Sequence, residues 1–163
     1  CEKAGQWQEA LSLLRDSLEA RLRADCYSYS AGISACDKSE QWQRAMLLFI
    51  EMQGAKLKLD TFIYNTAIRV YGNGWLASYS DGIVAGWQRA LSLFRELQEV
   101  RLDPDIVSYN ACARVCGAAF LWQQALLLLS ESCRAKVELD VFSFGTGISA
   151  CEKGGQWQRA FSL

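Results

Sequence analysis

The sequence predicts an all-α fold, a right-handed α-solenoid of stacked helix-turn-helix repeats (an α-α superhelix). The first observation is a set of tryptophans at separations of 35, 45, 35 and 35 residues: Trp7, Trp42, Trp87, Trp122 and Trp157. Each is followed at once by Gln and has Ala at the third position after it. Self-similarity at a fixed period near 35 residues is typical of stacked supersecondary units. The second observation is that each unit carries two apolar stripes at helical spacing.

Alignment on the tryptophans divides the chain into three complete units and two partial ones. The complete units are 26–60, 61–105 and 106–140. Residues 1–25 match the back of a preceding unit, and residues 141–163 match the front of a following one. Since the chain begins and ends within a repeat and starts with Cys, we interpret it as a fragment of a longer array. About three units are needed for a stable stack, because each buries its apolar face only against its neighbours.

Unit 106–140 illustrates the helical hairpin. Asp105 precedes the first helix and can cap it by accepting hydrogen bonds from the N–H groups of the first turn. The first apolar stripe is Tyr109, Cys112, Ala113 and Cys116. Small residues at 117–119 end this helix, and the second begins near Trp122. The second stripe is Ala125, Leu126, Leu128 and Leu129. Both helices are therefore amphipathic, as a solenoid requires.

The other units repeat this pattern. In unit 26–60 the two stripes are Tyr29, Ile33 and Cys36, then Ala45, Met46, Leu48 and Phe49. The alanine after each tryptophan is small enough to let paired helices approach closely. The tryptophans could be platforms for stacking bases, but their place at the start of the second helix favours a packing role.

Unit 61–105 contains a ten-residue insertion, 75–84, at its expected hairpin turn. It leaves both helices in register, as an insertion at the edge of a solenoid should. Its apolar residues are Trp75, Leu76, Tyr79, Ile83 and Val84. The sequence leaves three interpretations open: docking on the solenoid itself, binding of a partner, or a poorly selected coding segment.

Composition argues against several kinds of site. The net charge is −1 and the pI is about 5.5, so the bulk charge does not indicate a polyanion partner. Cys1, Cys36, Cys116 and Cys151 occupy the eleventh place of their units, as a recurring packing residue does. There is no histidine and no CxxC, so the usual zinc spacings are absent and we expect neither a metal nor another cofactor. No transmembrane run is present in the sequence.

The opening and closing strings of the units resemble the pentatricopeptide repeat family. The openings are Asp105–Asn110 (Asp-Ile-Val-Ser-Tyr-Asn), Asp60–Asn65 (Asp-Thr-Phe-Ile-Tyr-Asn) and, more weakly, Asp25–Ser30. Leu102–Asp105 (Leu-Asp-Pro-Asp) and Cys151–Gly155 (Cys-Glu-Lys-Gly-Gly) match as well. Tetratricopeptide repeats, at 34 residues, are the other hairpin array with so short a period. The resemblance covers the whole chain and implies sequence-selective binding of single-stranded RNA in mitochondria or plastids.

The resemblance also implies which residues read the bases. In this family the fifth residue of a unit, helped by the last, reads one base. The pairs are Ser30 with Asp60, Asn65 with Asp105, and Asn110 with Asp140. By the family's code, Asn with Asp favours uracil, with cytosine second, and Ser with Asp leans weakly to guanine. The implied target core is 5′-G-U-U-3′, parallel to the chain.

The second residue of each unit wedges between bases in this family. These positions are Tyr27, Phe62, Val107 and Phe142. Aromatic residues at three of them would strengthen stacking, which is worth about 1–3 kcal/mol per base. Gly145 stands at the fifth place of the last unit and has no side chain that could bond a base. We expect that unit to read nothing, or the array to lose register there.

Cations on the same face would contact the RNA backbone. Lys3, Lys38 and Lys153 match a lysine that the family uses for this purpose. The two units that lack it carry Arg69 and Arg114 one turn earlier, so each unit supplies one cation. The adjacent acids Glu2, Asp37 and Glu152 weaken this track. The alternative is a set of solvated surface lysines.

Each of these roles has a simpler structural interpretation. A recurring Asp is also an ideal helix cap, so its recurrence alone does not establish base readout. Asn65 and Asn110 are more diagnostic, because asparagine has a mediocre helix propensity and no local need within the first turns.

We therefore expect an RNA-binding module that positions a transcript for processing, stabilisation, editing or translation by other factors. No nucleophile–base pair or phosphate-binding glycine loop stands out, so we do not expect an enzyme. Without His and CxxC, the zinc deaminase domain of some family members is absent from this chain. The alternative is a protein-interaction scaffold of the tetratricopeptide type, which the low pI and the apolar insertion favour.

Overall fold

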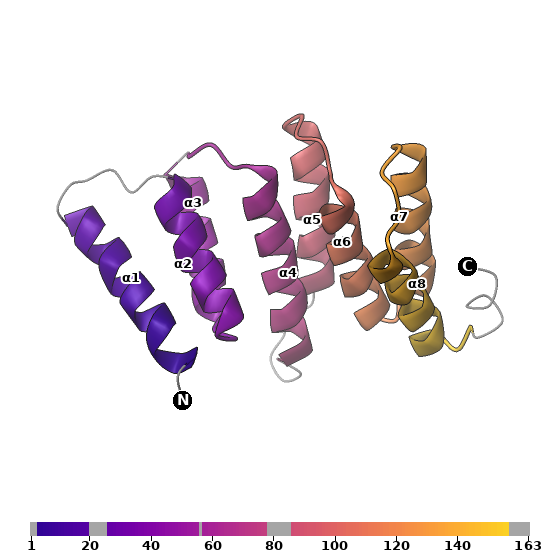
Figure 1. Cartoon of the computed structure of the whole chain (residues 1–163), viewed down its shortest axis with the longest axis horizontal. Helices are drawn as coiled ribbons and strands as arrows, with labels where there is room; N and C mark the ends of the chain where they lie inside the picture. Colours follow the sequence, from indigo (N-terminus) through magenta and orange to yellow (C-terminus); the bar gives the residue numbers. More distant parts are fainter. Residues whose placement is uncertain (1–2, 20–25, 56, 78–85, 157–163) are drawn as a thin grey trace.

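The computed structural model confirms the all-α solenoid. It describes residues 3–19, 26–55, 57–77 and 86–156. These form eight helices arranged side by side in chain order (Figure 1). The helices are α1 (Lys3–Glu19), α2 (Cys26–Lys38), α3 (Trp42–Gly54), α4 (Thr61–Ala77), α5 (Gly86–Glu99), α6 (Ile106–Ala118), α7 (Trp122–Arg134) and α8 (Val141–Lys153).

The helices pack in sequential pairs and form two layers. Within the hairpins, α2 packs on α3, α4 on α5 and α6 on α7. The even-numbered helices also contact one another, α2 with α4, α4 with α6 and α6 with α8. Among the described residues, α1, α3, α5 and α7 make no close backbone contact with each other. Since the odd-numbered helices are spread apart while the even-numbered ones touch, the even-numbered layer is the inner side of the curve.

Aspartates begin the inner helices, as expected from the sequence. The carboxylates of Asp105 and Asp140 accept hydrogen bonds from the backbone N–H groups of Ser108 (2.8 Å) and Ser143 (2.7 Å). Both serine hydroxyls complete capping boxes with the backbone of the capping aspartate. Asp60 accepts from the N–H of Ile63 at 2.9 Å in the same way.

Three of the inner helices, α2, α6 and α8, end through the same turn. The residues at the fifteenth place, Glu40, Phe120 and Gly155, have φ values of 59°, 61° and 67°. This left-handed backbone lets the next N–H turn back to the carbonyl of Cys36, Cys116 or Cys151, at 2.8, 2.9 and 2.8 Å respectively. All three cysteines have free thiols and no exposed surface, which confirms that they are packing residues.

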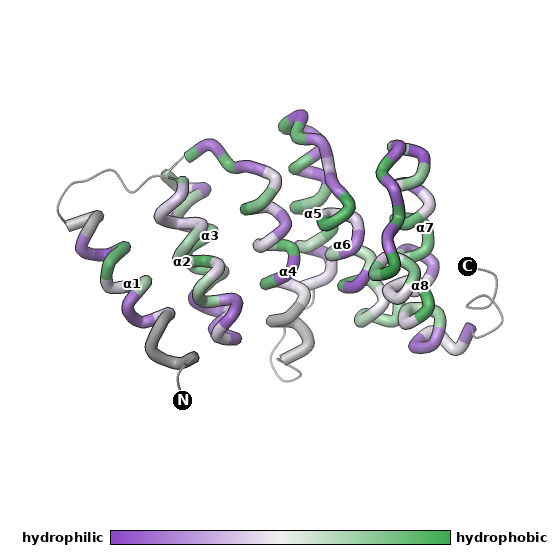
Figure 2. The backbone as a smooth tube through the Cα atoms, viewed as in Figure 1, coloured by the Kyte–Doolittle hydropathy of each residue, from purple (hydrophilic) through white to green (hydrophobic). Residues whose placement is uncertain are grey.

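The core runs along the length of the stack between the two layers. Each outer helix after α1 has a tryptophan at its first or second residue: Trp42, Trp87 and Trp122. These tryptophans pack against the core, which confirms their structural role. The alanines that follow them, Ala45, Ala90 and Ala125, have no exposed surface. Hydrophilic and hydrophobic residues are interspersed along the described helices (Figure 2). Trp157 and the alanine after it lie outside the described residues.

The inserted unit differs from its neighbours at the end of its inner helix. Helix α4 has 17 residues, whereas α2, α6 and α8 each have 13. Residues 75–77 of the insertion therefore continue α4 as helix, where we expected the hairpin turn. Residues 78–84, which complete the insertion, lie outside the described residues.

Candidate nucleic-acid interface

Four apolar side chains at the second place of the inner helices are exposed. The exposed fractions are 80% for Tyr27, 57% for Phe62, 52% for Val107 and 59% for Phe142. They come from α2, α4, α6 and α8 and recur once per repeat. We call the surface that carries these residues, together with the fifth and ninth residues of the same helices, the inner face. Because these exposed apolar groups recur at one place of each inner helix, we treat this face as a candidate binding surface.

Two of the three predicted fifth-and-last pairs are in contact on this face. The Asn65 amide donates a hydrogen bond from Nδ2 to Oδ1 of Asp105, at 3.0 Å. The Asn110 amide donates in the same way to Asp140, at 3.3 Å. Each pair joins an inner helix to the residue that caps the next one, so the side-chain geometry depends on the stacking of repeats.

This pairing determines which amide atom is left without a hydrogen-bond partner. A carboxylate only accepts hydrogen bonds, so the NH₂ group must point to the aspartate and the amide oxygen must point away from it. Asn65 and Asn110 are only 8% and 5% exposed. The Oδ1 atom of each is buried and accepts no hydrogen bond within the described residues. A buried acceptor without a donor costs about 1–3 kcal/mol, and a ligand N–H group would recover this cost where it reaches the oxygen.

Asp105 and Asp140 serve two functions at once. The same Oδ1 atom that caps the next helix also orients the asparagine. Burial raises the pKa of Asp105, but hydrogen bonds from Ser108 and Asn65 outweigh it, so this pKa lies below its usual value. Hydrogen bonds from Ser143 are the main reason why the pKa of Asp140 is lowered too. Both carboxylates are thus held ionised, the form that orients the amide.

The third pair is not joined in the same way. The Ser30 hydroxyl donates to the backbone carbonyl of Tyr27 in its own helix, at 2.8 Å. Asp60 caps α4, and no hydrogen bond between Ser30 and Asp60 is present in the described part of the chain. A serine side chain is shorter than an asparagine side chain and can bond within its own turn.

A pocket of about 220 Å³ lies between Val107 of α6 and Phe142 of α8, two of the four second-place residues that we call wedge residues after their expected role. Its lining residues are Arg69, Ile106, Val107, Asn110, Ala111, Arg114, Asp140 and Phe142. Apolar walls, an amide–carboxylate pair and two guanidinium groups therefore meet in one place. Such a combination can hold a flat, partly polar group with an anionic substituent.

A wider groove of about 620 Å³ continues along α6 and α8 past Phe142. It is lined on α8 by Gly145, Thr146, Ser149 and Lys153, and on α6 by Arg114 and Gly117, among others. A Cβ atom added at Gly145 would meet nothing within 4 Å. The fifth place of this repeat therefore presents open space, where α4 and α6 present an asparagine.

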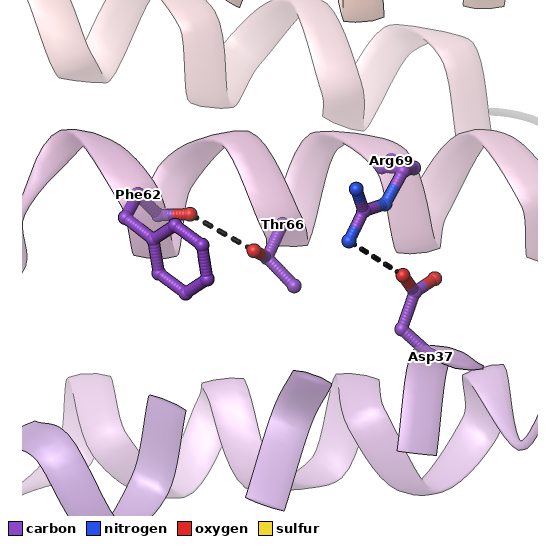
Figure 3. Close-up of polar contacts among 4 residues, drawn as sticks. All are labelled: Asp37, Phe62, Thr66 and Arg69. Atoms are coloured by element: carbon purple, nitrogen blue, oxygen red, sulfur yellow. Dashed lines mark hydrogen bonds and ion pairs between the residues drawn. The ribbon is translucent and has the colours of Figure 1, made fainter. Parts of the chain in front are cut away.

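The cations expected along the RNA backbone differ in their surroundings. Lys38 and Lys153 are exposed in the last turns of α2 and α8. The Arg69 guanidinium forms an ion pair with Asp37, 2.6 Å from Nη2 to Oδ2 (Figure 3). Burial and the charge of Arg69 lower the pKa of Arg114, while Asp37 raises it. Lys3 lies in α1, but its side chain is outside the described residues.

Sequence reasoning missed two features of this face. One is the ion pair that places Asp37 of one repeat against Arg69 of the next. Opposite charges at the twelfth and ninth places of consecutive units were the available signal. The other is the pair of buried threonines, Thr66 and Thr146, whose hydroxyls donate to the backbone carbonyls of the wedge residues Phe62 and Phe142, both at 2.9 Å.

Two other features are absent from the described part of the chain. Within residues 3–19, 26–55, 57–77 and 86–156, no group of three or more potential metal ligands comes together. None of the described helices combines the length and the apolar character that a membrane crossing requires.

The comparison with solved structures finds similar helical arrays. The crystal structure of the pentatricopeptide repeat protein PPR10, in complex with an 18-nucleotide psaJ RNA element, matches with a TM-score of 0.72 and 26% identity. The match covers 99% of this chain and 22% of PPR10. Another crystal structure of PPR10, from maize, matches with a TM-score of 0.66 and 21% identity. That match covers 96% of this chain and 21% of the PPR10 chain.

A third structure shows the same fold. The pentatricopeptide repeat domain of Arabidopsis thaliana protein-only RNase P 1, in complex with tRNA, matches with a TM-score of 0.66 and 16% identity. That match covers 80% of this chain and 64% of the other. No protein-family model and no curated protein sequence matches the chain.

Proposed function

We propose that the inner face of this chain, which is similar to pentatricopeptide repeat arrays, binds single-stranded RNA and reads one base per repeat. The observation that carries this proposal is the pair of buried asparagine oxygens, which are oriented by aspartates and lack a donor within the described residues. PPR10 was crystallised with an RNA element, and the match to this chain spans 22% of the length of PPR10.

The chemistry of the asparagine sites favours uracil. Single-stranded bases present their Watson–Crick edges to side chains of helical repeats. Uracil has an N–H donor at the centre of that edge, which suits an amide oxygen that has no other partner. Cytosine has an acceptor at the same position and can offer only its exocyclic amino group, so it ranks second. The ranking of uracil above the purines rests on the family's code.

The proposed target core is therefore 5′-G-U-U-3′, read by Ser30 with Asp60, Asn65 with Asp105, and Asn110 with Asp140. The uracils have the stronger support, because both asparagine–aspartate pairs are in contact. The guanine rests only on the family's code. Tyr27, Phe62, Val107 and Phe142 would stack on the bases, and Lys3, Lys38, Arg69, Arg114 and Lys153 would face the phosphates.

The cellular role follows from the family resemblance. We propose that the protein acts in a mitochondrion or chloroplast and positions a transcript for processing, stabilisation, editing or translation. Other factors would supply the chemistry, because among the described residues the inner face offers amides and cations but no nucleophile with an adjacent base. The alternative is a protein-interaction scaffold, which the acidic pI and the apolar insertion favour.

Fluorescence anisotropy with labelled RNA tests the proposal. The chain should prefer RNAs with a GUU core to RNAs with GAA or GCC cores. The double variant Asn65→Ala, Asn110→Ala should lose this preference, because each good base contact is worth about 1–3 kcal/mol. Gln43→Ala with Gln123→Ala is the matched control, since both glutamines are exposed on the outer helices.

The outcomes separate the two functions. A preference that the asparagine variant loses and the glutamine variant keeps supports base-by-base reading. Equal binding to every core in the unsubstituted chain contradicts it. Absence of RNA binding at low salt contradicts RNA recognition as a whole and favours a protein partner.

A further inference from the structure

Three charged side chains from consecutive repeats gather on the inner face. Asp37 lies near the end of α2, Arg69 in α4 and Arg114 in α6. Arg69 forms the ion pair with Asp37, and both Arg69 and Asp37 act electrostatically on Arg114. Arg69 and Arg114 also line the pocket that contains Asn110. The cluster therefore lies beside the proposed uracil site and carries a formal charge of +1.

Arg69 has the same orientation as the wedge residue of its repeat. Figure 3 shows Phe62, Thr66 and Arg69 on one side of α4, with the guanidinium turned toward Asp37 on the neighbouring helix. Residues at i, i+4 and i+7 lie on one face of an α-helix. A strand of RNA whose base stacks on Phe62 would thus run along the side of α4 that carries Arg69.

The two members of the ion pair differ in their access to a ligand. The Asp37 side chain is only 9% exposed, whereas that of Arg69 is 42% exposed. The Nε atom of Arg69 is buried and has no hydrogen-bond partner within the described residues. A guanidinium has five N–H donors, so one contact with Asp37 leaves others that a phosphate could use. The arginine is reachable from solvent, and the acid behind it holds it in place.

We propose that Asp37 competes with the backbone phosphate of bound RNA for Arg69, and so lowers the affinity of the inner face at this repeat. This inference rests on the proposed RNA binding. The carboxylate already neutralises the guanidinium. Without the charge of Asp37, the Arg69 guanidinium would no longer be neutralised and would attract a phosphate at this pocket more strongly. Asp37 is therefore a residue that limits affinity, although it contacts no base.

The variant Asp37→Asn tests this inference, because it keeps the shape of the side chain and removes its charge. RNA containing GUU should bind about twofold to fivefold more tightly, the range expected for one partly exposed charge pair. The affinity should also fall more steeply with salt, by about 0.7 in the logarithmic slope, since one more phosphate is neutralised. Asp37→Glu keeps the charge and should bind as the unsubstituted chain does.

A double-mutant cycle assigns the gain to Arg69. Arg69→Gln alone should weaken binding little, because Asp37 already neutralises this arginine. Asp37→Asn combined with Arg69→Gln should lose the gain of the single Asp37 variant. Asp103→Asn is the matched control for net charge, since Asp103 is exposed in the segment between α5 and α6. Thermal unfolding of each variant shows whether it is folded at the assay temperature.

Each of these binding measurements has a result that overturns the inference. Unchanged or weaker binding by folded Asp37→Asn contradicts it, and so does an equal gain in Asp103→Asn or a gain that persists without Arg69. If the unsubstituted chain prefers GUU and the Asp37 variant gains nothing, the competition fails while RNA reading stands. If the unsubstituted chain binds no RNA, both fail together.

Discussion

The pocket beside Asn110 and the groove beside Gly145 are neighbours on the inner face but have different contents. The first encloses about 220 Å³ and presents an amide held by Asp140. The second extends over about 620 Å³ and presents open space at the same place in its repeat. Both repeats begin with a capping box and carry an exposed wedge residue. The capping box and the exposed second residue are therefore the same with Asn or Gly at the fifth place, which decides whether the site presents an amide.

Two glycines of the wider groove show a second difference. A Cβ atom added at Gly117 would lie 2.9 Å from Cβ of Ala150 and 3.2 Å from its Cα. A Cβ atom at Gly145 would meet nothing. Gly117 thus allows α6 and α8 to approach closely, whereas Gly145 only leaves room. One glycine maintains the helix spacing and the other widens the groove.

The largest expected effect is on folding. Gly117→Ala should destabilise the chain by about 1–3 kcal/mol, because the new methyl group pushes against the backbone of α8. Gly145→Ala should be neutral or stabilising by about 0.5–1 kcal/mol, the usual gain for alanine within a helix. Urea unfolding followed by circular dichroism measures both. Equal stability of the two variants would show that close approach of α6 and α8 is not limited at Gly117.

The next effect converts one site into the other. Asn110→Gly should abolish the preference for uracil at its own position, a loss of about 1–3 kcal/mol in discrimination. The preference at the Asn65 position should remain. Anisotropy titrations with RNAs that differ at a single base measure this. Asn110→Ala controls for the greater backbone freedom of glycine and should give the same loss. A simultaneous loss at both positions would contradict independent reading by each repeat.

The reverse conversion should have a smaller effect. Gly145→Asn should introduce a preference for uracil at the next base of the RNA, by a few-fold, because the wider groove holds the new amide less firmly. The open space around Gly145 makes the substitution compatible with the fold. The measurement is binding to RNAs that vary only at that base, with Gly145→Ala as the control. Selectivity for a purine would contradict the proposed chemistry of the amide.

The smallest expected effect is that of low pH on the stability of the fold. The pKa values of Asp105 and Asp140 are lowered by their hydrogen bonds. A lowered pKa in the folded state means that the contribution to stability is complete above the unfolded value, near 3.9, and is lost as the pH falls through the folded value. The midpoint of thermal unfolding should therefore be unchanged between pH 7 and 5 and fall below about pH 4. In Asp105→Asn with Asp140→Asn this fall should be reduced. An equal fall in that variant would assign the acid sensitivity to other carboxylates.

The fold was predictable from the sequence because the same residue pattern occurs in several repeats, so each copy can be compared with the others. Helices α2, α6 and α8 begin at Cys26, Ile106 and Val141, the first residues of their units in the tryptophan alignment. Asp105 and Asp140 cap as expected, since capping depends on residues within one turn. The extension of α4 to Ala77 was not predictable, because the insertion occurs once and has no second copy to compare with.

The candidate site was predictable only in part. The pairing of Asn110 with Asp140 had been expected from a family resemblance, whereas its hydrogen bond, and the amide oxygen left without a donor, required the positions of two stacked repeats. Ser30 shows the limit, because its hydroxyl bonds its own helix and not Asp60. Periodicity identifies which residues recur on a face but does not give the direction in which each side chain turns.

The sequence by itself determined the period, the two helices of each repeat, their caps and the residues that face the core. Those features depend on local backbone chemistry and on contacts with the nearest neighbour at a constant register. Only the tertiary structure decided that Asp37 meets Arg69, that Arg69 and Arg114 share a pocket with Asn110, and that Gly117 touches Ala150 while Gly145 faces open space. These contacts depend on the distance and angle between successive inner helices, which are set by the packing of whole repeats.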